Sequence, residues 1–302
     1  MTWLKGARLE RDERLFIEGT VSRAKQLVRQ HIWAGVDEAR LETWFSQFET
    51  RQASLLGACL LDGFIFRSRA QVEAILHGAL CRPELVGPAG DSDQAVVQAL
   101  RGRNEAGIRL SPVIRLQDPP IKSGTYVLRR LFKLLRLDQK WATWPQNLHQ
   151  ITDLQMIIFV DDFCGSGQQF SDFALFVGLE QLMATNPNCR FIYLTVAAHE
   201  DGIKHVQTKY PRVEFIAGEI LGADHHFFRG ENLRNFKVDG LVERLRADYD
   251  RIASEVGFGR GKVPALGFEE QALCYAFDHG TPNNTLPIFW NQRDQWSSLV
   301  DR

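Results

Sequence analysis

Apolar residues recur at helical spacing through the first 80 residues of the chain. Between 20 and 33 they fall on one face of a helix, three and four positions apart. Asp37 fits the N-cap of a second helix, because its side chain can accept a hydrogen bond from the first turn. The segments 53–66 and 71–80 continue in the same style. We therefore expect a helical N-terminal region over residues 1–82.

From residue 83 onward the pattern changes, and short apolar runs alternate with amphipathic segments. The runs predict strands at 85–86, 112–116, 156–160, 189–198, 213–217 and 271–277. The amphipathic segments predict helices at 93–100, 125–137, 168–183, 202–208 and 238–256. This alternation favours an α/β fold with an open, mostly parallel sheet. We expect one such domain over 83–302, whose part 218–302 is a C-terminal extension that ends in turns rather than regular structure.

Composition and charge narrow the classes of protein. The 302 residues are 44% hydrophobic, and 36 Lys and Arg against 37 Asp and Glu leave a net charge of -1. No global charge draws the chain to nucleic acid or to a membrane surface. The apolar stretch 55–66 is broken by Asp62 and is too short to span a bilayer, and the first residues lack the apolar core of a signal peptide.

The five cysteines are scattered, odd in number and without a CxxC pair. That pattern disfavours a disulfide framework and a zinc cage. The expected location is therefore a reducing cytoplasm, with no membrane association.

The most informative stretch runs from Met156 to Gly167. Five apolar residues lead into Asp161 and Asp162, and a loop with Ser166 between two glycines follows. Neighbouring residues on a strand point to opposite faces, so the two acids share a ligand only if the strand ends there. The glycines predict that it does. In open α/β sheets, ligands bind beyond the carboxyl ends of the strands.

The loop has the chemistry of a phosphate site. Gly165 and Gly167 allow a tight turn that exposes backbone N–H groups, and the next helix begins there. Hydrogen bonds to a charged group contribute about 1.5–3 kcal/mol each, whereas an exposed helix dipole adds about 0.3–1 kcal/mol. The N–H groups should therefore dominate. Two carboxylates would repel a phosphate, so we expect them to face the sugar hydroxyls.

Other strand–acid–glycine motifs fit less well. A Walker B strand needs a partner GxxxxGK[ST] loop, and the only Gly-Lys candidate, Gly261-Lys262, lacks both the glycine spacing and the following hydroxyl. A dinucleotide fingerprint needs a third glycine where Phe170 stands. A purely structural strand–turn–helix remains as an alternative.

The motif resembles the phosphoribosyl-diphosphate loop of type I phosphoribosyltransferases over about residues 151–217, with Ser166 where Thr is common. The resemblance implies a reaction through an oxocarbenium-like ribose, with Asp161 and Asp162 facing the ribose hydroxyls as catalytic residues. It also implies that the loop wraps the 5-phosphate; the loop residues are Phe163, Cys164, Gly165, Ser166 and Gly167.

A narrower resemblance adds the tail His279–Trp290, with its His-Gly-Thr-Pro-Asn-Asn run. Together with Val-Asp-Asp-Phe-x-Gly-Ser-Gly, it is similar to a bacterial subfamily associated with anti-phage and other conflict systems, including some retrons. This resemblance implies a defence-system partner protein or a reverse transcriptase complex. The tail residues His279, Asn283 and Asn284 are possible substrate-side residues, and turn formation is the alternative. His199 is a further candidate because it ends a predicted strand at the edge where this fold binds ligands, and a polar loop is the alternative there.

Two segments are candidates for the diphosphate loop. One is 87–92, and the other is Lys122-Ser123-Gly124, which lies between a predicted strand and helix just before the main motif. We prefer the second, because Lys122 would balance the diphosphate charge as a catalytic residue and Ser123 and Gly124 would donate N–H groups. Mg²⁺ would be held by the diphosphate and water, without direct protein ligands.

The remaining polar clusters have simpler interpretations. Asp224-His225-His226 lacks a matching third metal ligand, so we interpret it as a loop. A basic helix near 129–140 is typical of a solvated face, so direct nucleic-acid contact is not expected. Two functions stay open: a phosphoribosyltransferase-like effector acting on phosphoribosyl diphosphate or a nucleotide, and a non-catalytic ribose-phosphate or nucleotide sensor that regulates a partner.

Overall fold

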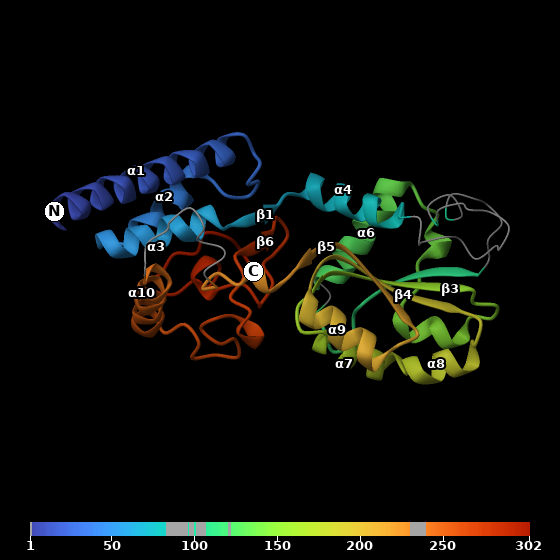
Figure 1. The fold of residues 1–302 in the computed structure, drawn as a ribbon. Helices are drawn as coiled ribbons and strands as arrows, with labels where there is room; N and C mark the ends of the chain where they lie inside the picture. The colour runs from blue at the N-terminus through green and yellow to red at the C-terminus, as the bar shows by residue number, and fades with distance from the viewer. Residues whose placement is uncertain (1, 83–95, 97–99, 101–106, 120–121, 230–239) are drawn as a thin grey trace. The chain divides into compact units, whose positions relative to one another are not determined.

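The computed structural model describes the chain except for residues 1, 83–95, 97–99, 101–106, 120–121 and 230–239 (Figure 1). The chain divides into two compact units. One combines residues 1–69 with 223–302, and the other comprises 70–222. Each unit is described by itself below.

Three helices open the first unit: α1 (Thr2–Arg29), α2 (Glu38–Ser46) and α3 (Arg51–Asp62). The predicted cap is confirmed, since the Asp37 carboxylate accepts from the Arg40 backbone N–H at 2.7 Å. Thr50 caps α3 in the same way, accepting from the Ala53 N–H at 3.1 Å. The expected N-terminal helices are therefore present, and side-chain caps mark the starts of α2 and α3.

The helix expected over 53–66 ends at Asp62, and its last residues form strand β1 (Ile65–Arg67) instead. β1 pairs in parallel with β6 (Tyr275–Phe277) in a two-stranded sheet. The helical prediction for 65–66 was wrong because three residues carry too little periodicity to indicate a strand. The strand partner lies near the other end of the sequence, where a local pattern cannot detect it.

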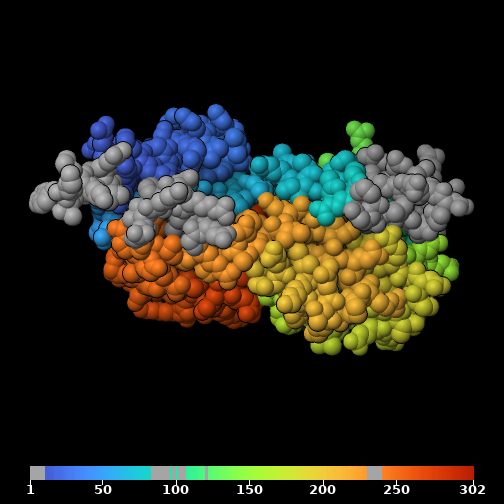
Figure 2. Space-filling model, viewed as in Figure 1, coloured from blue at the N-terminus to red at the C-terminus, as the bar shows by residue number. Residues whose placement is uncertain are grey.

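The C-terminal segment packs with the N-terminal helices rather than with the larger sheet. Trp44 of α2 is fully buried; it stacks on Phe289 with ring centroids 5.6 Å apart and donates its indole N–H to the Ile288 carbonyl at 2.8 Å. Helix α10 (Leu241–Val256) contributes to the same core. Figure 2 shows the blue surface of the first helices and the orange and red surface of 241–302 on this unit.

This arrangement differs from the predicted division at residue 82. The segment expected as an extension of the α/β domain, 218–302, instead supplies most of its residues to the unit that holds the N-terminal helices. The physical reason is that apolar side chains from both ends of the chain bury one another in a common core. Burial of this kind depends on contacts distant in sequence, whereas the predicted boundary followed local texture.

The second unit is a parallel α/β layer structure, as predicted. Its four-stranded sheet has the order β2-β3-β4-β5, and every neighbouring pair is parallel. The strands are β2 (Ile108–Pro112), β3 (Met156–Cys164), β4 (Arg190–His199) and β5 (Val213–Leu221). The helices are α4 (Arg69–Leu80), α6 (Ser123–Leu135), α7 (Gln168–Val177), α8 (Leu179–Thr185) and α9 (Glu200–Lys209).

The core of this unit explains why β3 and β4 read as continuous apolar runs. Both are buried on both faces, as central strands of a parallel sheet are. On one face, Phe159, Phe170 and Tyr193 form an aromatic cluster that joins the sheet to α7, with Phe170 stacked on Tyr193 at 4.2 Å. This packing fixes α7, and with it the loop that precedes α7.

Some predicted boundaries shift. β2 ends at Pro112, where the expected strand began, and the helix expected over 168–183 is two helices broken at Gly178, whose φ is +62°. The strand expected at 85–86 and the helix at 93–100 lie outside the described residues, apart from 96 and 100. Short 3-10 turns occur at Gln139–Trp141, Pro145–Gln150, Ala223–His225, Phe268–Glu270 and Pro287–Phe289.

No helix among the described residues combines the length and the apolar character that crossing a membrane requires.

Candidate functional site

The two acids of the main motif lie on β3 itself, not beyond it. The strand continues through Asp161 and Asp162 to Cys164, and its pairing with β4 persists, with Asp161 opposite Thr195 and Phe163 opposite Ala197. The prediction that the strand ends at the acids was therefore wrong. Continued ladder hydrogen bonds hold this stretch extended, so the two side chains leave the strand in alternate directions, while their carboxyl groups stay close enough to interact.

Asp161 is enclosed by the protein, with 0% of its surface exposed. Its carboxylate accepts from the Gln169 side-chain amide at 2.8 Å, from the Tyr193 hydroxyl at 3.3 Å and from the Asp162 backbone N–H at 3.1 Å. Burial, followed by the neighbouring charge of Asp162, raises the pKa of Asp161 well above its ordinary value. Asp161 is therefore a hydrogen-bonded interior group.

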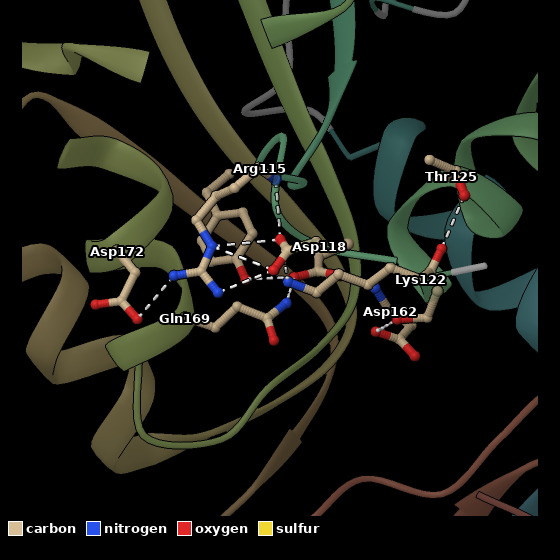
Figure 3. Close-up of polar contacts among 10 residues, drawn as sticks. Arg115, Asp118, Lys122, Thr125, Asp162, Gln169 and Asp172 are labelled. Carbon is tan, nitrogen blue, oxygen red and sulfur yellow. Dashed lines mark hydrogen bonds and ion pairs between the residues drawn. The ribbon is translucent and has the colours of Figure 1, made fainter. Parts of the chain in front are cut away.

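Asp162 is only half-buried and meets a different set of groups. Its Oδ1 accepts from the Ser123 hydroxyl at 2.8 Å and from the Phe163 backbone N–H at 2.8 Å. A Cβ added to Gly124 would lie 3.4 Å from Asp161 Oδ1. The structure thus brings the first turn of α6 to the carboxyl end of β3, and two of the predicted diphosphate-loop residues, Ser123 and Gly124, lie beside the acids. Figure 3 shows Asp162 near Lys122 and Thr125 of this segment.

The glycine loop begins after Cys164 and leads directly into α7. Gly167 has a φ of +80°, a conformation that favours glycine, and it occupies the N-cap of α7, where no side chain caps the helix. A Cβ on Gly167 would lie 2.9 Å from His205 Cδ2 and 3.0 Å from the Gly202 carbonyl oxygen. The loop is thus tight, and it ends at a helix N-terminus, which is a suitable place for an anion.

Gly202 in the first turn of α9 is a residue that sequence reasoning missed. A Cβ there would lie 2.5 Å from the Gly165 carbonyl oxygen and 2.9 Å from Cys164 Sγ. Glycine therefore lets α9 approach the loop closely and fix its shape. The available signal was a glycine soon after a strand end. Burial raises the pKa of Cys164 to about 12, so this thiol stays protonated near neutral pH.

A charged network lies between β2 and α7 (Figure 3). Lys122 donates to Asp118 at 2.9 Å, and Arg115 donates to the same carboxylate at 2.9 Å and to Asp172 of α7 at 3.2 Å. Burial alone would raise the pKa of Asp118, but the hydrogen bonds from Arg115 and Lys122 outweigh it and hold the pKa well below its ordinary value. Sequence reasoning missed Arg115, Asp118 and Asp172, since no spacing rule links them.

His199, predicted at the substrate side, lies at the end of β4 and is almost fully buried. Its Nδ1 accepts from the Asp201 backbone N–H at 3.2 Å, so it caps α9. A helix cap is a structural role that needs no ligand. The alternative diphosphate segment 87–92 lies outside the described residues.

The tail residues belong to the other unit, where they make local contacts. His279 stacks on Phe277 with centroids 4.9 Å apart, and its Nδ1 lies 3.5 Å from Asp278 Oδ1. Asn284 is buried and donates its side-chain amide to the Phe268 carbonyl at 3.2 Å. Asn283 accepts from the Phe268 backbone N–H at 2.7 Å through its own carbonyl. These contacts fit a turn-forming role.

Three observations bear on metal binding. Across the described ranges, no group of three or more His, Cys, Asp or Glu side chains is arranged to hold an ion. In the Asp224-His225 pair, His225 Nδ1 lies 2.8 Å from the Asp224 carboxylate. The half-buried carboxylate of Asp162 beside the Ser123 hydroxyl is an oxygen donor set, the kind that Mg²⁺ prefers.

A parallel α/β unit with a glycine loop at the carboxyl end of a central strand defines a class of phosphate-binding fold. The family assignment is more specific: the PRTase-CE family model matches residues 41–302, and the chain belongs to this phosphoribosyltransferase-like family. No curated protein matches the sequence.

Three solved structures are similar to parts of the chain. Orotate phosphoribosyltransferase from Aeropyrum pernix is 12% identical with a TM-score of 0.29, covering 50% of this chain and 71% of that one. The AQ2163 protein from Aquifex aeolicus is 14% identical with a TM-score of 0.31, covering 61% and 83%. Helicobacter pylori xanthine-guanine-hypoxanthine phosphoribosyltransferase is 14% identical with a TM-score of 0.29, covering 53% and 84%.

Proposed function

We propose that the loop 163–167 binds the phosphate of a ribose 5-phosphate group and that the protein acts on phosphoribosyl diphosphate or a nucleotide. The observation that carries the proposal is the tight turn at Gly167, which leads from β3 into the N-terminus of α7. Backbone N–H groups at such a turn suit an anion. Asp162, half-buried at the same end of β3, provides a carboxylate for sugar hydroxyls.

The proposed reaction is glycosyl transfer through an oxocarbenium-like ribose. The protein's contribution is to hold the phosphate in the loop, to place a carboxylate near the positive charge that develops on the ring, and to hold the leaving diphosphate. Ser123 and Gly124, in the first turn of α6, are the proposed diphosphate donors. Lys122 is paired with the Asp118 carboxylate in this structure. It can bind the diphosphate only after it leaves that carboxylate.

Magnesium fits this scheme as a metal that arrives with the diphosphate. The oxygen donors beside the loop, Asp162 and the Ser123 hydroxyl, suit it, and no dedicated protein cage occurs among the described residues. When bound, the ion would neutralise diphosphate charge. Positioning of the sugar and phosphate remains with the loop and with α7.

The Lys122–Asp118 ion pair also favours a second candidate function. A lysine that remains bound to its own carboxylate does not balance a leaving group, so the pocket would hold a ribose phosphate or nucleotide without turning it over. The protein would then be a sensor whose occupied state regulates a partner. Both functions require the glycine loop, and they differ in whether Lys122 changes partner.

We also propose a role in bacterial anti-phage or other conflict systems. Its support is the likeness of the Val-Asp-Asp-Phe-x-Gly-Ser-Gly loop and of the His279–Trp290 tail to defence-associated proteins, including some found with retrons. The partners in such a role would be a defence-system protein or a reverse transcriptase complex. Expression with and without neighbouring genes during phage infection tests this role by plaque counts.

A turnover assay separates the enzyme from the sensor. The purified chain is incubated with phosphoribosyl diphosphate and Mg²⁺, with and without a nucleotide mixture, and released diphosphate is measured. Asp162→Asn should abolish the release, while Asp153→Asn, the same chemical change on an exposed loop, should leave it unchanged. Binding without release supports the sensor, and no binding of any ribose phosphate contradicts both functions.

A further inference from the structure

The two adjacent acids of β3 lie in different surroundings. Asp161 contacts Gln169 of α7 and Tyr193 of β4 and is closed off from solvent. Asp162 contacts Ser123 of α6 and is half-buried. Because β3 continues through both residues, their side chains leave the strand on opposite faces. The two carboxylates therefore have different partners, and of the two only Asp162 is reached by solvent.

One partner of Asp161, Tyr193, is itself fixed in the core. The Tyr193 ring is fully buried and stacks on Phe170 at 4.2 Å, with the rings 23° from parallel. Gln169 and Phe170 are consecutive residues in the first turn of α7, the helix that begins at the glycine loop. Asp161 thus joins the strand, the neighbouring strand and the start of α7 through side-chain contacts.

Asp161 also holds the peptide that carries its neighbour. Its Oδ1 accepts from the Asp162 backbone N–H at 3.1 Å, while Oδ2 accepts from Gln169 and Tyr193. A carboxyl group fixed on one side by α7 and β4 therefore fixes the backbone of Asp162 on the other. This contact gives Asp161 a route to influence ligand binding without touching the ligand.

We infer that the acids have separate roles: Asp162 alone faces the sugar, and Asp161, held by Gln169 and Tyr193, is a positioning residue that orients Asp162 and the start of α7. The inference rests on the proposed function and deepens it, because it assigns one ribose-facing carboxylate where the motif predicts two. It also adds Gln169 and Tyr193 as positioning residues.

The charge balance at the loop agrees with this assignment. Burial and the nearby Asp162 charge raise the pKa of Asp161, so its carboxyl group keeps its proton to a higher pH than an ordinary aspartate does. A protonated Asp161 repels an anionic ligand less than an ionised one would. Asparagine at 161 keeps the neutral state and an oxygen that can accept from the Asp162 N–H, whereas alanine keeps neither hydrogen-bonding group.

The test is a calorimetric titration of Mg²⁺-phosphoribosyl diphosphate into the wild type and three variants. Asp161→Asn should bind within about threefold of the wild type, whereas Asp161→Ala and Asp162→Asn should each lose about tenfold or more. Recovery by asparagine but not alanine is the signature of positioning. Equal losses of affinity in Asp161→Asn and Asp162→Asn would overturn the separate roles of the two acids but not the proposed function. No binding of the ligand to the wild type would overturn both.

A second measurement follows the fold of the same variant. With a raised folded-state pKa, Asp161 lowers wild-type stability as pH rises from its ordinary value toward that raised value, because the unfolded chain ionises first. Asp161→Asn lacks this loss, so its melting temperature relative to the wild type should increase as the pH rises above the ordinary aspartate value of about 4. A relative melting temperature that falls over this range would contradict the buried positioning role of Asp161.

Discussion

Replacing Gly167 with alanine tests the tight turn on which the phosphate site depends. The φ of +80° is a left-handed conformation, and an L-residue there costs about 1–2 kcal/mol. The added Cβ would also lie 3.0 Å from the Gly202 carbonyl oxygen, a backbone atom that cannot rotate away. Overpacking of this kind adds about 1–3 kcal/mol. The free energy of unfolding should therefore fall by about 2–5 kcal/mol in total.

Gly178→Ala is the matched control. Gly178 also has a positive φ, +62°, but the nearest atom to its added Cβ is the side-chain Nε2 of His149 at 3.4 Å, an ordinary contact distance. Its loss should be limited to the conformational strain, about 1–2 kcal/mol. The excess loss in Gly167→Ala measures the close approach of α9 to the loop.

Thermal unfolding followed by circular dichroism provides the comparison. For a unit of this size, each kcal/mol lowers the melting temperature by about 2–4 °C, so Gly167→Ala should melt below Gly178→Ala by several degrees. Binding of ribose 5-phosphate should be lost in Gly167→Ala and kept in Gly178→Ala. Equal melting temperatures and equal binding in the two variants would refute the close-packed turn.

Three further changes test other parts of the structure. Asp118→Asn should lower the melting temperature near neutral pH and lose this effect as the pH falls below the ordinary aspartate value toward the depressed folded-state value, because over that range the unfolded chain takes up a proton before the folded chain does; a pH series of melting curves checks it. Trp44→Ala should cost about 3–5 kcal/mol by denaturant unfolding, whereas the exposed Trp144→Ala should change little. Gly202→Ala should destabilise the fold, since its Cβ would lie 2.5 Å from a loop carbonyl; an unchanged melting temperature would contradict that contact.

The sequence predicts the parallel α/β fold because β3 and β4 are buried on both faces, which leaves uninterrupted apolar runs. The helix cap at Asp37 is equally predictable from the sequence, since it depends on residues three positions apart. β1 and the shared core of Trp44 and Phe289 were missed for the opposite reason. Their partners are distant in sequence, and only burial in the folded chain brings them together.

At the site, the sequence predicts the glycine loop but not the different burial and partners of Asp161 and Asp162. Two adjacent aspartates look equivalent in a sequence, and the expected end of the strand made them neighbours around one ligand. The separation of Asp161 from Asp162 arises from pairing with β4 and from packing of α7, which no local spacing encodes. The Arg115–Asp118 network was missed because its residues follow no metal or nucleotide motif.

The central claim is that the loop 163–167 holds a ribose 5-phosphate. Isothermal titration of ribose 5-phosphate into the wild-type chain, with ribose and inorganic phosphate titrated in parallel, tests it most directly. The account predicts saturable binding of ribose 5-phosphate that is tighter than the binding of phosphate and much tighter than the binding of ribose. It also predicts that Asp162→Asn weakens the binding of ribose 5-phosphate. No detectable binding of ribose 5-phosphate, or binding that Asp162→Asn leaves unchanged, would contradict it.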